Sequence, residues 1–199
     1  MRSGRIGGAL IIGGWLLFLA TIAVVLLGGS AGLGGSGLGS LTLGLGLALV
    51  GAGAAITSVA GPPPFRGRAI RVGLAILAVG LLSSTASSLI GSLSTNDPLE
   101  SWPVIILFVV GSLASLVGST MTVISLLLAS GRSRSVGLLS AIGVGLLAVA
   151  AILGSQKDLG FSIVVAALAV IGGCAVVAAG VGVGFLAFNG EQPATVTTE

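Results

Sequence analysis

The sequence predicts an all-α membrane protein with six transmembrane helices, and three observations lead to this fold class. The 199 residues are 55% hydrophobic and only 7% charged, and the mean hydropathy is +1.23. Soluble domains carry about 25% charged residues, so this chain would have no polar shell in water. Six apolar segments are each long enough to cross the hydrocarbon of a bilayer, which takes about 20 residues. The arginines fall at regular places between these segments.

The predicted spans are the six longest apolar runs of the chain. They cover residues 7–28, 41–60, 72–93, 103–129, 136–154 and 161–188. We expect helices because a backbone in lipid must satisfy its own hydrogen bonds. The first run is too long for the apolar region of a signal peptide, which has about 7–15 residues, so it is interpreted as a retained helix. Residues 1–190 then form one membrane domain, and residues 191–199 form a polar cytoplasmic tail.

The arginines predict the orientation. They precede the first, third and fifth spans, at Arg2, Arg5, Arg66, Arg68, Arg71, Arg132 and Arg134. Lys157 is the one basic residue expected on the other side. Because basic loops stay in the cytoplasm, both termini are predicted to be cytoplasmic. The abundance of Gly, Ala, Val and Arg is typical of a GC-rich genome, so we expect the cytoplasmic membrane of a prokaryote.

An internal repeat divides the chain into three tandem, parallel helical hairpins at about residues 5–70, 71–133 and 134–190. In each repeat an arginine is followed nine residues later by a glycine, about 13 Å further along the helix. These glycines are Gly14, Gly80 and Gly143. The second helix of each repeat has two glycines seven residues apart, Gly44/Gly51, Gly111/Gly118 and Gly173/Gly180. Since such a pair shares one face, we expect all nine glycines to lie at helix–helix contacts. The alternative is chance spacing in a chain with 35 glycines.

A row of hydroxyl residues follows the fourth span at a spacing of three and four. It comprises Ser112, Ser115, Ser119 and Thr122. Helix packing, with hydroxyls bonded back to carbonyls of their own helix, is the favoured interpretation. A polar lining for a solute path is the alternative.

Several kinds of chemistry are disfavoured by the residues that the spans lack. No span has an ionisable side chain in its interior, whereas proton-coupled carriers and rotary-ATPase proteolipids need one. The chain has no histidine, which excludes histidine-ligated haem and Ser-His catalysis and removes the common zinc sets. Asp97 and Glu100 are interpreted as solvated charges of a turn, and Cys174 as a small packing residue. We therefore expect no enzymatic activity, cofactor, metal site or nucleic-acid partner.

The repeating pattern resembles the HdeD-type acid-resistance membrane family. The matching stretches are RVGLAILAVGLL with LGLGLALVGAG, and RSVGLLSAIGVGLL with VIGGCAVVAAG. The resemblance covers nearly the whole chain. It implies six helices in three parallel hairpins with both ends inside, and it supplies no catalytic residues.

Two classes of function are weighed on this basis. The favoured hypothesis is a non-enzymatic structural or accessory subunit, embedded in lipid and assembling with itself or with other membrane subunits. The alternative is a small channel or facilitator without proton coupling, which would use the hydroxyl row. An intramembrane enzyme is a third and less favoured class.

Overall fold

The computed structural model describes residues 2–27, 37–62, 65–93, 102–154 and 163–190, and these residues form an all-helical fold. Its elements are α1 (Arg2–Leu27), α2 (Gly37–Ala60), α3 (Arg68–Leu93), α4 (Trp102–Leu127), α5 (Arg132–Gly154) and α6 (Ile163–Asn189). All six are long and apolar enough to cross a membrane. The predicted fold class is therefore confirmed as far as six helices of transmembrane length, which suggests a multi-pass membrane protein.

The helices that begin with arginine start about one turn earlier than their apolar runs. The helix α3 starts at Arg68 and α5 at Arg132, while the apolar runs start at residues 72 and 136. Hydropathy marks the part of a helix that lies in hydrocarbon, but the helix continues past it. Arginine at a helix N-terminus is unfavourable for the helix dipole. The starts of α1, α3 and α5 share this feature, which helix stability alone does not explain.

The helix ends have recognisable local causes. Pro103 lies in the first turn of α4, where a missing amide N–H has no cost. The helix α6 ends at Asn189 and is followed by Gly190, which has a φ of 65° and whose amide donates to the Leu186 carbonyl at 3.1 Å. A left-handed glycine is the usual helix terminator because other residues strain in that conformation. Gly131, with a φ of 68°, lies in the turn between α4 and α5, where its carbonyl accepts from the Arg134 amide at 3.2 Å.

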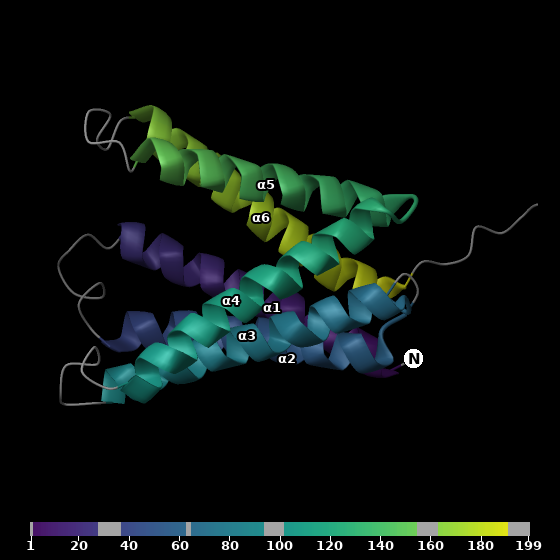
Figure 1. The fold of residues 1–199 in the computed structure, drawn as a ribbon, viewed down its shortest axis with the longest axis horizontal. Helices are drawn as coiled ribbons and strands as arrows, with labels where there is room; N and C mark the ends of the chain where they lie inside the picture. Colours follow the sequence, from purple (N-terminus) through teal and green to yellow (C-terminus); the bar gives the residue numbers. More distant parts are fainter. Residues whose placement is uncertain (1, 28–36, 63–64, 94–101, 155–162, 191–199) are drawn as a thin grey trace, which may run out of the picture.

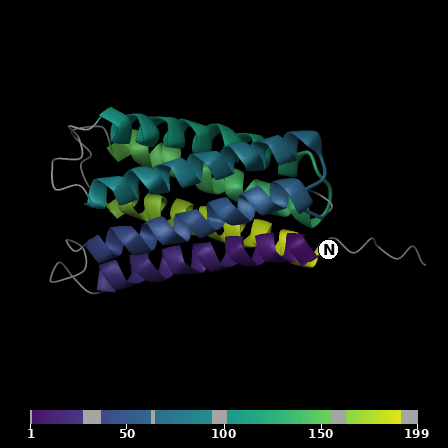
Figure 2. The same cartoon turned by 90° about the horizontal axis from the view of Figure 1, so that it is seen from below.

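The helices pack in cyclic order. Each contacts the next one along the chain, and α1 also contacts α6. The contact between α4 and α5 is the smallest of these. Figure 1 shows α5 and α6 meeting the other helices at one end of the molecule and diverging from them towards the other. Figure 2 shows the same helices from below, running roughly along one common axis.

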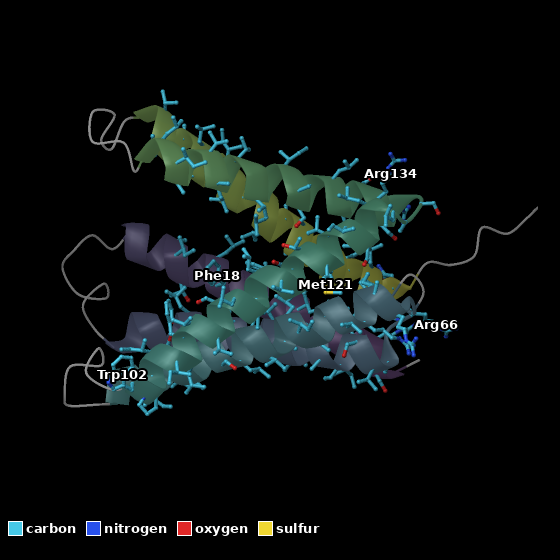
Figure 3. The ribbon with its side chains drawn as sticks, viewed as in Figure 1. Phe18, Arg66, Trp102, Met121 and Arg134 are labelled. Carbon is cyan, nitrogen blue, oxygen red and sulfur yellow. The ribbon has the colours of Figure 1, made fainter. Side chains whose placement is uncertain are left out.

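The described arginines and the core share one end of the molecule. Figure 3 places Arg66 and Arg134 at the end where the chain starts, and Trp102 at the opposite end. Phe65, between α2 and α3, is fully buried there. It belongs to a cluster with residues from α2, α3, α4 and α6, namely Ala54, Ile70, Leu74, Ala78, Leu126, Leu186 and Ala187. The cluster therefore packs four of the six helices against one another at this end.

Candidate functional site: three glycine crossings

The helices α1 and α2 approach each other closely where two glycines face each other. A Cβ placed on Gly14 would lie 2.6 Å from the Gly46 carbonyl oxygen, and a Cβ on Gly46 would lie 3.0 Å from the Gly14 carbonyl oxygen. Neither distance leaves room for a side chain. The crossing therefore exists because both positions lack one.

The same reciprocal contact recurs between α3 and α4. A Cβ on Gly80 would lie 2.8 Å from the Gly111 carbonyl oxygen, and one on Gly111 would lie 3.0 Å from the Gly80 carbonyl oxygen. Between α5 and α6, a Cβ on Gly172 would lie 3.0 Å from the Gly143 carbonyl oxygen. Three successive helix pairs thus cross at equivalent glycines.

Two of the pairs have a second crossing, seven residues nearer the arginine end. A Cβ on Gly53 would lie 2.6 Å from the Gly7 carbonyl oxygen, and one on Gly118 would lie 2.7 Å from the Gly73 carbonyl oxygen. In the third pair the corresponding residues are Val136 and Ala179. Larger side chains replace both glycines, and Val136 packs instead against Gly182, where a Cβ would lie 3.0 Å from Val136 Cγ2.

Five of the nine glycines that the sequence singled out lie at contacts inside a helix pair: Gly14, Gly80, Gly111, Gly118 and Gly143. Gly44 and Gly51 instead face α3, where a Cβ on Gly51 would lie 3.2 Å from Leu82 Cγ. Gly180 faces α1, and a Cβ there would overlap the Trp15 indole.

The expectation for Gly173 is wrong. A Cβ on this residue would have no atom within 4 Å, and the adjacent Gly172 makes the contact with α5. Adjacent helix residues point about 100° apart, so only one of the two glycines can face α5.

Sequence reasoning missed five of the crossing residues, Gly7, Gly46, Gly53, Gly73 and Gly172. A signal for two of them was present, because α2 contains two interleaved pairs with a spacing of seven, Gly44/Gly51 and Gly46/Gly53. Spacing alone cannot tell which pair faces α1 and which faces α3.

The hydroxyl row of α4 does not share one environment. Ser112 is exposed, and Ser119 Oγ donates to its own helix at the Leu116 carbonyl, 3.0 Å away. Thr122 is buried against Gly73 of α3, and its Oγ1 donates to the Gly118 carbonyl at 2.8 Å. Ser115 lies against Gly80, whose Cβ would be 2.5 Å from the serine Oγ. The close approach at these two positions leaves no space for a solute between α3 and α4.

Two hydroxyls at the crossings are buried without a hydrogen-bond partner, Thr57 Oγ1 and Ser115 Oγ. Thr57 lies beside Gly7 in the α1–α2 crossing, and Ser115 beside Gly80 in the α3–α4 crossing. By contrast, Ser87 Oγ donates to the Val104 carbonyl at 3.0 Å and so links α3 to α4. The hydroxyls of this region contact helix backbone rather than one another.

Within the part of the chain that the structure describes, no group of three His, Cys, Asp or Glu residues could hold a metal ion. Cys174 is exposed on α6, although the sequence suggested a packing residue. Asp97 and Glu100 lie outside the described residues. The geometry of the crossings brings two helix backbones together. In comparisons with known proteins, no protein-family model, curated protein or solved structure matches this chain.

Proposed function

We propose that this protein is a non-enzymatic structural or accessory subunit of a membrane complex, which is either a homo-oligomer or a larger assembly. In this proposal the six helices are three tandem parallel hairpins in the cytoplasmic membrane of a prokaryote. The arginine end and both termini face the cytoplasm, as the positive-inside rule requires. The repeated glycine crossings support a triplicated hairpin, and the HdeD-type family is the resemblance that fits this architecture.

The observation that carries the proposal is the apolar face of α4. Only 11% of the apolar window of α4 is buried inside the molecule, against 39% for α2. The face is made of exposed large side chains, including Ile106, Val109, Leu113, Leu116, Val117 and Ile124. A helix that is packed on one narrow side and apolar on the rest meets lipid or another protein. A subunit uses such a face for assembly.

Purification in mild detergent followed by mass analysis tests the proposal. We expect either a homo-oligomer or stoichiometric co-purifying membrane proteins. Leu113→Trp on α4 should insert normally but disturb the assembly, because the added bulk blocks a protein contact and is tolerated by lipid. Ile171→Trp on α6 is the matched control, since Ile171 is 57% and Leu113 58% exposed. A monomer with no partner, whose behaviour neither substitution changes, would contradict the proposal.

The channel or facilitator hypothesis remains the alternative. It has less support because Ser115 and Thr122 are pressed against α3. Flux of a neutral solute into vesicles that contain the purified chain alone would favour it.

A further inference from the structure

One face of α6 carries three glycines that are spaced for close contact with a second helix. Gly173 and Gly180 are seven residues apart, and Gly184 follows four residues later, so all three share one side of the helix. This side faces α1: a Cβ on Gly184 would lie 3.0 Å from the Gly8 carbonyl oxygen, and one on Gly180 would overlap Trp15. The contact is as close as the crossings inside the helix pairs.

The contact stops about halfway along the face. Gly173 is about 10 Å beyond Gly180 along the helix, and a Cβ on it would meet nothing within 4 Å. On α1 the corresponding position is Leu19, one turn beyond Trp15, and it is 38% exposed. Figure 1 shows α6 diverging from α1 in this half of the molecule. The face has the residues for close packing, but only half of it is packed.

The helices α5 and α6 are held to each other where they leave the rest of the molecule. The crossing of Gly143 with Gly172 joins them near their middle. Their contacts with the other helices are at the arginine end, where a Cβ on Gly137 of α5 would lie 3.0 Å from Leu126 of α4. A pair that is tight inside and anchored at one end can swing as one body.

We infer that α5 and α6 form an arm that closes on α1, with the Gly8–Gly184 contact as its pivot and Gly173 packing against Leu19 in the closed state. An apolar seam in lipid is held by van der Waals contact, which the open half gives up. Closure regains that contact, and glycine at position 173 allows the backbone of α6 to approach without a clash. The opening faces the half of the membrane away from the arginines. This inference does not depend on the proposed assembly role.

Disulfide formation between paired cysteines tests the inference in membranes that contain the full chain. All variants carry Cys174→Ala. The test pair is Leu19→Cys with Gly173→Cys, and the contact reference is Trp15→Cys with Gly180→Cys. The control pair is Gly13→Cys with Gly173→Cys, because Gly13 is also open but lies on a different side of α1. A disulfide forms only when the two Cα atoms come within about 7 Å.

We expect the test pair to form an intramolecular disulfide at least five-fold faster than the control pair, and the contact reference to form one faster still. A test pair that reacts no faster than the control, while the reference reacts, would show an arm that is fixed open. A product of twice the mass would assign the Gly173 face to contact between two copies and overturn closure. If the reference fails to react, the contact between α1 and α6 at Trp15 and Gly180 is absent and the inference falls with it.

Discussion

At the scale of single residues, the crossings depend on the absence of a side chain at each glycine. A Cβ on Gly118 would overlap the Leu77 amide nitrogen and lie 2.7 Å from the Gly73 carbonyl oxygen. Both neighbours are backbone atoms, which cannot rotate away as the end of a flexible side chain can. Even a methyl group must therefore push the two helices apart. In lipid, little hydrophobic force holds helices together, so that loss of contact directly lowers the stability of the protein.

Gly118→Ala should therefore destabilise the protein, and Gly145→Ala should not. Overpacking costs about 1–3 kcal/mol, and at Gly118 it outweighs the gain of about 1 kcal/mol that alanine brings to a helix. A Cβ on Gly145 would meet nothing within 4 Å, so only the gain applies there. The measurement is the melting temperature of each variant in the same mild detergent. Equal melting temperatures for the two variants would show that the α3–α4 crossing is not close in the membrane.

At the scale of elements, one serine hydroxyl stabilises the contact between α3 and α4 and another destabilises it. Ser87 Oγ donates across the interface to the Val104 carbonyl at 3.0 Å, whereas the buried Ser115 Oγ has no partner. An interhelical hydrogen bond in a membrane protein contributes about 0.6 kcal/mol on average. An unpaired buried hydroxyl costs about 1–3 kcal/mol.

The same substitution should consequently act in opposite directions at these two serines. Ser87→Ala should lower the free energy of unfolding by about 0.5–1.5 kcal/mol, and Ser115→Ala should leave it unchanged or raise it. Reversible unfolding in mixed detergent, followed by circular dichroism, measures both values. A clear loss of stability in Ser115→Ala would mean that its hydroxyl has a partner, such as the Gly111 carbonyl one turn earlier.

The loose contact between α4 and α5 also has an explanation at this scale. When the crossing glycines Gly46 and Gly111 are aligned, Leu116 of α4 takes the place of Gly51 of α2. A Cβ on Gly51 would lie 3.3 Å from Leu81 Cβ of α3, so glycine at this position lets α3 approach closely. Leu116 has a full side chain and is 63% exposed. Position 116 of α4 therefore has no equivalent of the close approach that glycine allows at position 51 of α2.

The elements were predictable from sequence, but their faces were predictable only in part. Hydropathy found all six helices because a membrane span must be apolar along about 20 residues. It placed the start of α5 at residue 136 rather than at Arg132, since an interfacial turn looks like a loop in hydropathy. The spacing of seven identified Gly111 and Gly118 correctly. It chose Gly173 over Gly172 because a periodicity of seven does not state which neighbouring helix the face meets.

At the scale of the whole molecule, the described arginines and the buried cluster around Phe65 share one end. Arg66 and Arg134 lie at the end where the chain starts, and Trp102 lies at the other (Figure 3). Arginines at the N-termini of α1, α3 and α5 oppose the helix dipole, which costs about 0.3–1 kcal/mol for each charge near a helix end. When that end is cytoplasmic, the preference of arginine for the cytoplasmic side of the membrane offsets this cost.

The topology that follows can be tested by labelling single cysteines in a Cys174→Ala background with a membrane-impermeant maleimide on intact cells. Cysteines at Gly67 and Ser135, which are exposed at the arginine end, should be protected until the membrane is permeabilised. Ser133 is unsuitable as a labelling site because it is fully buried. Cysteines at Ser36, Asn96 and Gln156, which lie outside the described residues, should react from outside without permeabilisation.

Successive loops lie on alternate sides of the membrane, so each additional or missing span would move every later loop to the opposite side. Labelling of Gly67→Cys from outside, with protection of Asn96→Cys, would show that the protein has the opposite orientation. The positive-inside rule would then not explain the position of its arginines. Labelling of Gly67→Cys and Asn96→Cys on the same side would mean that α3 does not span the membrane. Ser135→Cys and Gln156→Cys make the same comparison for α5, whose exposed large side chains, such as Ile142 and Ile152, are best explained by lipid on most of its surface.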